Sequence, residues 1–347
     1  MPTYEINPLV DPRWNEFVTR HTASSVFHSQ KWLEALSRSY GYESAVLTTT
    51  APGQRLQNGI VFCRIKSMLT GSRVVSLPFS DHCQPLVTAQ GELAELIHTL
   101  KESVAAKGWK YLELRPSEDI GADIPMGLEA SALFCLHRLD LRQDEDVLFR
   151  NCHKSCVQRK IQRAERDALT LEEGRSDRLL MLFYDLLLLT RRRHQLPPQP
   201  LTWFKHLIRS FGEALTIKVA FKDQQPLASM LTLLHGKTLV YKYGCSDARF
   251  HNMGAMPFLF WNMLTNGKRR GAEELDFGRS ELDNPGLISF KDHWGGARTE
   301  LTYYRYSTRA PGKAAKRWKL DAIRKAFSLL PDVCQRTAGT VLYKHIG

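Results

Sequence analysis

Long hydrophobic runs are missing from this sequence. Its most apolar stretch, Leu186 to Leu189 with its neighbours, ends at Arg191, Arg192 and Arg193, far short of the about 20 residues that cross a bilayer. The N-terminal residues, MPTYEINPLVDPRW, contain no basic segment followed by an apolar one, so no secretory signal is visible. We therefore expect a cytoplasmic protein that is soluble or bound peripherally on the inner face of the membrane.

Cysteine is scarce and odd in number, with seven residues scattered along the chain. This pattern favours reduced thiols over a disulfide framework. Cys152 and Cys156 lie four residues apart on one helix expected over Asp144–Arg166, with His153 between them. No second pair of ligands stands near them in the sequence, so we predict no metal site. Cys245 follows an expected strand, where packing is favoured over a role as a nucleophile.

Several sequence signatures of enzymes are also missing. The chain has no Gly-x-x-x-x-Gly-Lys-Ser/Thr, no Gly-x-Gly-x-x-Gly after a strand, no Gly-x-Ser-x-Gly and no His-Glu-x-x-His. These absences argue against a P-loop, a dinucleotide-binding loop, a hydrolase nucleophile elbow and a zinc protease motif. Nothing in the sequence requires a metal or a redox cofactor.

What the sequence does contain is an excess of basic residues. Its 347 residues include 48 Lys and Arg against 36 Asp and Glu, a net charge of +12, and 43% of them are hydrophobic. At about 150 residues per domain, this length favours two globular domains. The segment Arg305–Gly347 holds ten Lys and Arg and two Asp and Glu, a net charge of +8. Such a segment suits an anionic partner, such as nucleic acid, an acidic membrane or a phosphorylated substrate.

The order of expected elements occurs twice. In each half, three strand-like segments precede a helix, and one strand follows it. Lys107–Leu114, where a helix ends at Lys-Gly and an alternating strand begins, aligns with Arg270–Phe277, about 163 residues later. We interpret the chain as an α+β protein with two related domains, 1–140 and 141–305, each a mixed sheet flanked by helices, followed by a basic tail over 306–347.

Polar residues gather in the second half of the chain. A loop carrying Arg249 and His251 follows one expected strand and leads into a helix that begins near Gly254 and Ala255. Backbone N–H groups at the start of such a helix suit a phosphate or an oxyanion. A plain strand-to-helix turn fits this stretch of sequence equally well.

Two further segments concentrate reactive side chains. A strand ending within Asp276–Ser280 brings a guanidinium and a hydroxyl to the carboxyl edge of a sheet, a frequent position for sites in α/β architectures. The segment Ser289–Gly296 holds a cation, an imidazole, an indole and two glycines. Together these side chains favour a functional site over a scaffold loop.

These motifs resemble those of the FemAB-like acyltransferases, including the group linked with exosortase loci and exopolysaccharide gene clusters. The resemblance covers nearly the whole chain in order. It rests on Tyr241-x-Tyr243-Gly-x-Ser246-Asp247, Gly254-Ala255 with Trp261, Asp276-Phe-Gly-Arg-Ser280, Phe290-Lys-x-x-Trp294-Gly, and the earlier His28-Ser-Gln-x-Trp32 and Thr190-Arg-Arg-Arg-His194.

The resemblance implies two fused acetyltransferase-type (GNAT) domains. It also implies an N-acyltransferase that moves an acyl or aminoacyl group to an amine of a cell-envelope precursor. The acceptor would be a peptidoglycan muropeptide or an exopolysaccharide amino sugar, in some cases lipid-linked. The donor would be acyl-CoA or aminoacyl-tRNA, a co-substrate rather than a tightly bound cofactor.

Roles for individual residues follow from the same resemblance. Lys291 matches the lysine that faces the donor carbonyl or phosphate, and we assign it the electrophilic role. Tyr243 and Asp276 are the candidates for orienting the amine and receiving its proton. The residues expected to bind substrate are Arg279, Ser280, Trp294, Arg192, Arg193, His194 and Tyr241. The residues expected to bind the donor are Arg249, His251, Gly254 and Ala255. For the Arg192–His194 segment, a solvated basic end of a helix is the competing interpretation.

The tail supplies a separate indication. In Lys313–Leu330, apolar residues recur at three- and four-residue intervals among basic ones. This pattern is typical of an amphipathic helix that lies on an anionic membrane or docks on a domain of the same chain. A second function also stays open: a non-catalytic adaptor that binds RNA or a membrane through a decayed acyltransferase fold, since a fold alone does not decide function.

Overall fold

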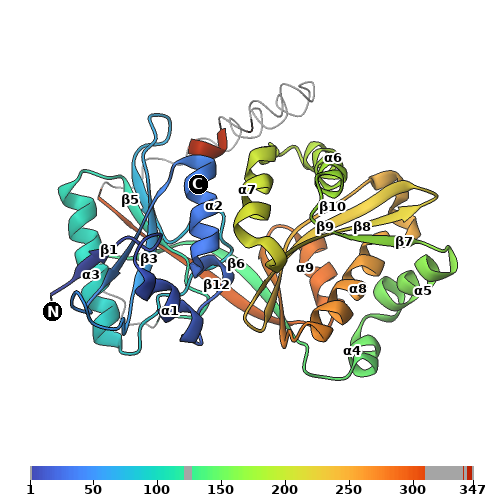
Figure 1. The fold of residues 1–347 in the computed structure, drawn as a ribbon, viewed down its shortest axis with the longest axis horizontal. Coiled ribbons are helices and arrows are strands. Elements are labelled where there is room, and N and C mark those ends of the chain that lie inside the picture. The colour runs from blue at the N-terminus through green and yellow to red at the C-terminus, as the bar shows by residue number, and fades with distance from the viewer. Residues whose placement is uncertain (1, 121–126, 309–338, 340–341, 346–347) are drawn as a thin grey trace. The chain divides into compact units, whose positions relative to one another are not determined.

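The computed structural model describes residues 2–120, 127–308, 339 and 342–345 (Figure 1). Within this part of the chain, two compact units can be distinguished. The first contains residues up to Phe134 together with 300–308 and 342–345, and the second contains 135–299 and 339. The chain leaves the first unit inside strand β6 (Glu129–Asp140) and returns to it inside strand β12 (Ala297–Ser307). The boundaries expected at residues 140 and 305 lie at or near the ends of these strands.

The first unit begins with a strand and two capped helices. Its elements are β1 (Tyr4–Ile6), α1 (Pro12–Arg20), α2 (Gln30–Tyr40), β2 (Glu43–Thr48), β3 (Ile60–Ile65), β4 (Arg73–Val75), α3 (Gln90–Ala106) and β5 (Tyr111–Leu114). Asp11 caps α1 by accepting a hydrogen bond from the N–H of Arg13, and Ser29 caps α2 through the N–H of Trp32. Each cap satisfies an N–H group that has no partner within its helix, which sets where the helix begins.

The strands of the first unit form a mixed sheet in the order β1-β2-β3-β4-β5-β12. Neighbours from β1 to β4 are antiparallel, β4 and β5 are parallel, and β12 is antiparallel to β5. Helix α3 packs on one face of this sheet and buries Leu96, Ile97 and Leu100 against Phe62 and Leu112. The single parallel pair follows from the chain crossing over through α3 between β4 and β5.

The second unit has the same plan. Its elements are α4 (Glu145–Asn151), a π-helical turn (Lys154–Gln158), α5 (Arg159–Arg166), β7 (Thr170–Gly174), α6 (Asp177–Arg193), α7 (Leu201–Phe211), β8 (Leu215–Lys222), β9 (Gln225–His235), β10 (Thr238–Ser246), a 3₁₀ segment (Ala248–Met253), α8 (Ala255–Arg269), β11 (Glu274–Glu281) and α9 (Pro285–Asp292). The strand order is β7-β8-β9-β10-β11-β6. Again four antiparallel strands precede one parallel pair, β10 with β11.

The repeat predicted from the sequence is therefore confirmed. Strands β5 and β11, which contain the two aligned segments, occupy equivalent positions, each parallel to the strand before it and each preceded by a long helix. The last strand of each sheet comes from the other half of the chain: β6 lies beside β11, and β12 beside β5. Each unit is thus an α+β layer structure with a mixed sheet between helices.

Helices cover both faces of the second sheet. Helices α6 and α7 lie on one face, and α5 and α8 lie on the other (Figure 1). The core below α8 includes Leu259, Phe260 and Met263 of that helix together with Met230 and Phe277 from the strands. This packing leaves the carboxyl ends of β10 and β11 beside the N-terminus of α8, where the second unit carries its polar residues.

One expectation about local structure was wrong. The single helix expected over Asp144–Arg166 is broken, because Cys152 and His153 have non-helical backbone angles between α4 and the π-helical turn. The segment beginning at Ser289, for which no element was predicted, forms the end of helix α9 up to Asp292, and Asn284 caps this helix through the N–H of Leu287.

No helix among the described residues is long and apolar enough to cross a membrane.

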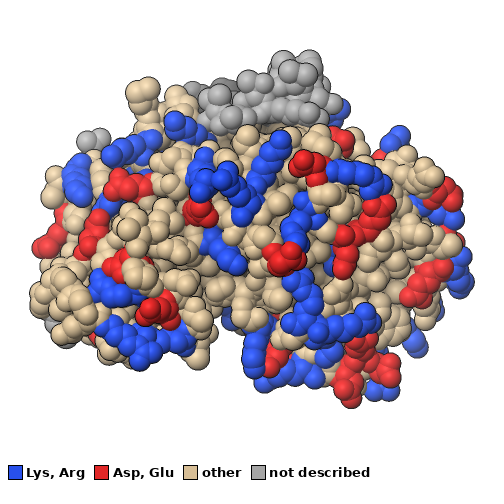
Figure 2. All heavy atoms as spheres, in the orientation of Figure 1, with Lys and Arg blue, Asp and Glu red and all other residues tan. Residues whose placement is uncertain are grey.

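On the face shown in Figure 2, Lys and Arg side chains are interspersed with Asp and Glu rather than gathered in one continuous patch. The amphipathic helix expected over Lys313–Leu330 lies outside the described residues. The free cysteines of the described part are Cys63, Cys83, Cys135, Cys152, Cys156 and Cys245.

The buried carboxylate of Glu113 on β5 gives a test of the first unit. Burial alone would raise the pKa of Glu113, but the guanidinium groups of Arg115 and Arg305 bring it below its ordinary value of 4.5. The folded state therefore gains stability from the ionised form at neutral pH, and this gain is lost as the pH falls through the lowered pKa. We expect Glu113→Gln to lower the free energy of unfolding by about 3–5 kcal/mol at pH 7, because the buried guanidinium of Arg115 loses its counter-charge.

Urea denaturation of wild type and Glu113→Gln at several pH values measures this effect. The difference between the two proteins should shrink at acid pH. The exposed Glu102, which lies beside His98 on α3, provides the control Glu102→Gln, which should change stability by less than about 0.5 kcal/mol. Equal effects of the two substitutions at pH 7 would contradict the assignment.

Candidate functional site

The parallel pairing of β10 with β11 is short. It consists of Thr238 with Glu274, Leu239 with Leu275 and Val240 with Asp276. Strand β10 then has an irregularity between Tyr241 and Tyr243 in its pairing with β9. Beyond Val240, β10 is no longer paired with β11 but stays paired with β9 as far as Ser246. The two strands β10 and β11 therefore diverge at the carboxyl end of the sheet.

The two tyrosines of β10 lie on opposite faces of the sheet. The Tyr241 ring packs 4.5 Å from Phe260 of α8. The Tyr243 ring instead packs 5.2 Å from Phe204 of α7, and its hydroxyl accepts a hydrogen bond from Nε1 of Trp203 at 2.9 Å. The residues expected to bind substrate and to take part in catalysis are therefore divided between the two faces.

Asp276 lies on the same face as Tyr243. Its neighbour Phe277 stacks on Phe260 of α8, so alternation along β11 directs Asp276 to the α6–α7 side. One carboxylate oxygen of the buried Asp276 accepts a hydrogen bond from the N–H of Gly278 at 2.7 Å. Gly278 has a φ of +70°, a conformation that glycine adopts without strain, and the carboxylate holds this turn of the strand in place.

Lys291 is a buried cation on helix α9, with only 2% of its surface exposed. Its ammonium donates hydrogen bonds to the carbonyl oxygens of Gly278 at 2.7 Å and Arg279 at 3.0 Å. A buried charge requires such partners, because an uncompensated ammonium would pay a large desolvation cost. The lysine therefore ties α9 to the end of β11 at the segment that carries Arg279 and Ser280.

Two buried polar atoms near this segment have no hydrogen-bond partner among the described residues. They are Oγ of Ser280 and Nε1 of Trp294, whose residues are each 1% exposed. The Trp294 indole packs 5.2 Å from Phe260, on the α8 side. Buried polar groups are rarely left unpaired in native proteins, and exceptions are common where a ligand or water completes the site.

A second group of polar side chains gathers where β10 ends. The hydroxyl of Ser246 lies 2.9 Å from Nε2 of His251, and the guanidinium of Arg193 lies 3.5 Å from the same nitrogen. Arg193 and Thr190 both donate to the carbonyl oxygen of Ser246 at 3.2 Å. The end of α6 is thereby fastened to the end of β10.

Burial, and then the positive charge of Arg193, lower the pKa of His251 below its ordinary value of 6.5, although Asp247 acts in the opposite direction. His251 is therefore largely neutral at pH 7 and can accept a proton. His194, the C-cap of α6, has its pKa lowered by burial and by the neighbouring Arg193 and Arg191. Arg192 is exposed on the last turn of α6.

The loop from Asp247 to Gly254 brings the chain to the N-terminus of α8. Asp247 accepts a hydrogen bond from the N–H of Arg249 and forms an ion pair with its guanidinium at 2.6 Å. The guanidinium of Arg249 is 74% exposed. Helix geometry leaves the N–H groups of Ala255 and Met256 without partners inside α8, at the positive end of a helix of 15 residues.

Gly254 is the one residue of this loop that must be glycine. Its φ is +73°, and a Cβ there would overlap the carbonyl oxygen of Lys160 on α5. The backbone of α5 therefore lies directly against the start of α8. This close approach sets the position of the loop and of the first N–H groups of α8.

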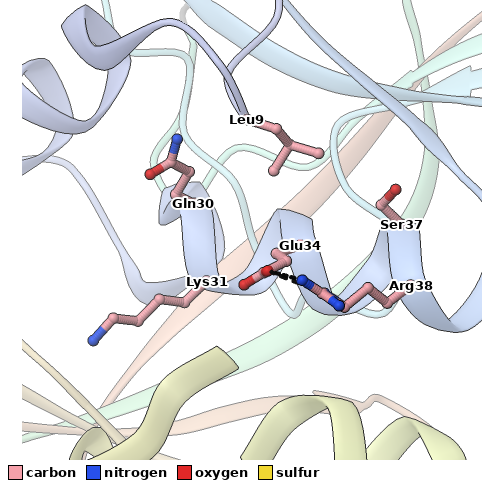
Figure 3. Close-up of a pocket in the computed structure, with 6 residues that line it drawn as sticks. All are labelled: Leu9, Gln30, Lys31, Glu34, Ser37 and Arg38. Carbon is pink, nitrogen blue, oxygen red and sulfur yellow. Dashed lines mark hydrogen bonds and ion pairs between the residues drawn. The ribbon is translucent and has the colours of Figure 1, made fainter. Parts of the chain in front are cut away.

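A separate cavity of about 450 Å³ lies in the first unit. Figure 3 shows the residues that line it, which are Leu9, Gln30, Lys31, Glu34, Ser37 and Arg38. Most of them come from one face of α2, and Glu34 and Arg38 form an ion pair at 2.7 Å. Gln30 belongs to the early motif that the sequence singled out, and its amide donates to the carbonyl oxygen of Pro8 at 3.0 Å.

Sequence reasoning missed some residues of the polar group around His251. Thr190 and Ser246 stand in the quoted motifs but were not assigned a role, and Trp203, the partner of Tyr243, lies outside them. The structure brings together Arg193, Ser246 and His251, and separately Lys291 with the backbone of Gly278 and Arg279. Arg279 is half-buried and lies 3.6 Å from Glu281.

Part of the second unit is similar to a known protein family. Residues 153–291 match the family model of an acetyltransferase (GNAT) domain. FemX has a similar fold, with a TM-score of 0.70 and 14% identity over 88% of this chain and 97% of that chain. No curated protein matches the chain in sequence.

Two further solved structures share the fold. A tandem GNAT protein from the clavulanic acid biosynthesis pathway has a TM-score of 0.57 and 12% identity, over 90% of this chain and 99% of that chain. The C-terminal domain of a protein from Agrobacterium fabrum named as a lysylphosphatidylglycerol synthetase has a TM-score of 0.55 and 14% identity, over 86% and 91%. At these identities the likeness concerns the fold.

Gly254 allows a test of the geometry at the start of α8. We expect Gly254→Ala to destabilise the protein more than Gly271→Ala. Both glycines have positive φ, which costs alanine about 1–2 kcal/mol, but a Cβ at Gly271 meets nothing within 4 Å. The overlap with the Lys160 carbonyl should add about 1–3 kcal/mol to the cost at Gly254. Thermal denaturation of the two variants measures the difference, and equal losses would contradict the described contact.

Proposed function

We propose that the protein is an acyltransferase that transfers an acyl group from acyl-CoA to an amine of a cell-envelope precursor. The match of residues 153–291 to the model of an acetyltransferase (GNAT) domain and the fold shared with a tandem GNAT protein support this proposal. The acceptor in this proposal is a peptidoglycan muropeptide or an exopolysaccharide amino sugar. The observation that carries the proposal is the divergence of β10 from β11 beside the N-terminus of α8. The division into domains 1–140 and 141–305 is part of the same proposal.

The donor is proposed to bind with its phosphates at the start of α8. Backbone N–H groups at a helix N-terminus attract phosphate, and α8 begins at Ala255 directly after this loop. The exposed guanidinium of Arg249, which is paired with Asp247, lies in the same loop and offers hydrogen-bond donors. These features fit a pyrophosphate. Acyl-CoA, when bound, supplies the activated thioester. The side chains of this chain position the acceptor amine and accept its proton.

The acceptor amine must lose a proton before or during its attack on the thioester carbonyl, and the C–S bond then breaks, so that CoA leaves as the free thiol. His251 is proposed as the proton acceptor, because its lowered pKa keeps it neutral at pH 7 and it lies at the end of β10. Tyr243 and Asp276 lie on the same face of the sheet, and their expected role of orienting the amine is kept as a proposal.

Lys291 is proposed as a positioning residue. Direct contact with the donor carbonyl, the role expected from the resemblance, would require its ammonium to leave the two buried carbonyl oxygens that it now satisfies. Held as it is, Lys291 fixes the segment of β11 from which Arg279 and Ser280 extend. The unpartnered hydroxyl of Ser280 and the guanidinium of Arg279 are proposed to contact substrate.

The remaining basic residues are proposed to bind anionic parts of the acceptor. Arg192, Arg193 and His194 end helix α6, and Arg193 already contacts the Ser246–His251 pair. A precursor carrying phosphates, whether nucleotide-linked or lipid-linked, would suit these cations. Tyr241 and Trp294, on the α8 side, are proposed to line the apolar part of the site.

The choice of donor can be tested directly. Isothermal titration calorimetry of the purified protein with acetyl-CoA and, side by side, with aminoacylated tRNA should give saturable binding of acetyl-CoA. Binding of charged tRNA alone would replace acyl-CoA by aminoacyl-tRNA in the proposal. Binding of neither would favour the alternative, a non-catalytic adaptor that binds RNA or a membrane.

Substitution of Lys291 separates a positioning role from a direct one. We expect Lys291→Met to lower kcat at least about tenfold and also to lower the free energy of unfolding by about 1–3 kcal/mol, because two buried carbonyl oxygens lose their donor. The control is Lys237→Met, a change at an exposed lysine paired with Glu273, which should leave both quantities nearly unchanged. Loss of kcat with unchanged stability would instead indicate direct contact with the donor.

The pH dependence tests His251. As the pH falls through a pKa below 6.5, His251 becomes protonated and can no longer accept a proton, so kcat/KM should decrease on the acid side. We expect His251→Asn to lower kcat/KM at pH 7 by about 100-fold and to remove this acid limb, whereas His98→Asn, at an exposed position on α3, should do neither. An acid limb that persists in His251→Asn would assign the base to another group.

A further inference from the structure

The break between α4 and α5 brings three potential metal ligands together. His153, Cys156 and His293 each offer one ligand atom, and these atoms all lie within 4.8 Å of one another. His153 is the N-cap of the π-helical turn that contains Cys156, and His293 follows helix α9, about 140 residues later in the chain. The sequence predicts no metal site here, because no second ligand pair stands near Cys152 and Cys156 along the chain. The contact with His293 exists only in the folded chain.

Backbone contacts hold the segment around His153 against the segment around His293. The N–H of His153 donates to the carbonyl oxygen of His293 at 2.8 Å, and the two imidazole rings lie 4.4 Å apart. A Cβ at Gly295 would lie 3.5 Å from the carbonyl oxygen of Asn151, so the chain on either side also packs closely. The three side chains are therefore gathered by a scaffold that exists without any bound ion.

The helix break also decides which cysteine belongs to the group. Cys152 is buried, and its thiol donates to the carbonyl oxygen of Leu148 inside α4. Cys156 lies one turn beyond the break and is only partly buried. His153 caps this turn, accepting a hydrogen bond at Nδ1 from the N–H of Cys156 at 3.2 Å, which places its ring over the same turn as the Cys156 thiol.

We propose that His153, Cys156 and His293 bind a divalent transition metal ion of the zinc type. Two imidazoles and one thiolate form a donor set that Zn²⁺ accepts and that Mg²⁺ and Ca²⁺, which prefer oxygen, do not. Ligand atoms at about 2.0–2.3 Å from one Zn²⁺ are separated from each other by roughly 3.5 Å, so small side-chain rotations close the site. A fourth position is left for water or a substrate atom.

A hydroxyl group beside His293 can hold its ring in place. The hydroxyl of Ser289 lies 3.4 Å from Nε2 of His293 and can accept the proton of that nitrogen while Nδ1 binds metal.

A bound metal ion would restrict the position of helix α9. His293 is two residues from Lys291 and adjoins Trp294, so a metal shared with His153 and Cys156 fastens the end of α9 to the turn before α5. Helix α5 in turn supports the start of α8 through the Lys160 carbonyl. The inference goes beyond the proposed acyl transfer and does not depend on it.

Cobalt substitution tests the site without any assay of activity. The full chain, freed of metal with a chelator, is titrated with Co²⁺ and then with Zn²⁺. We expect one Co²⁺ per chain, a visible spectrum of a four-coordinate ion, a thiolate-to-cobalt charge-transfer band in the near ultraviolet, and displacement by one equivalent of Zn²⁺. Cys156→Ser should abolish the charge-transfer band and weaken Co²⁺ binding at least about tenfold.

Two further variants keep the test independent of any single substitution. Cys152→Ser changes the neighbouring thiol, which lies outside the group, and should keep both the band and the affinity. His293→Gln removes the ligand contributed by the other segment and should weaken binding as Cys156→Ser does, with circular dichroism confirming that each variant is folded. Wild-type protein that binds no Co²⁺ saturably, or a charge-transfer band that persists in folded Cys156→Ser, would overturn the proposal.

Discussion

The shortness of the parallel ladder between β10 and β11 is the constraint on which the second unit depends. Three residue pairs join the strands, after which β10 follows β9 and leaves β11. The irregularity at this point sends Tyr241 and Tyr243 to opposite faces. It also places the end of β10 and the start of α8 side by side, so that His251, Arg193 and the first N–H groups of α8 belong to one edge of the sheet.

Buried polar groups hold the backbone around this edge. Lys291 bonds the carbonyl oxygens at the end of β11, Asp276 bonds the N–H of Gly278, and Thr190 bonds the carbonyl oxygen of Ser246. Such groups are costly unless satisfied, so once formed they define a single arrangement of the chain. The polar residues of the second unit therefore have two roles. Some hold the backbone in place, and others can contact a substrate.

The elements of the fold could largely be predicted from the sequence, because their signals are local. The α+β repeat and the equivalence of β5 and β11 follow from periodicity and turn residues. Helix α9 was not predicted, because its eight residues are too few for a helical period to stand out in the sequence. The break at Cys152 and His153 was missed because neither residue is a recognised helix breaker.

The two-fold repeat, the location of the polar motifs in the second half and the resemblance to acyltransferases can be read from the sequence. Which of those polar residues meet depends on the folded chain. It buried Lys291 against the backbone, joined His251 to Ser246 and Arg193, and brought His293 to His153 and Cys156. The physical reason is that periodicity and capping act over a few neighbouring residues, whereas these contacts join segments far apart in the chain and depend on how strands and helices pack.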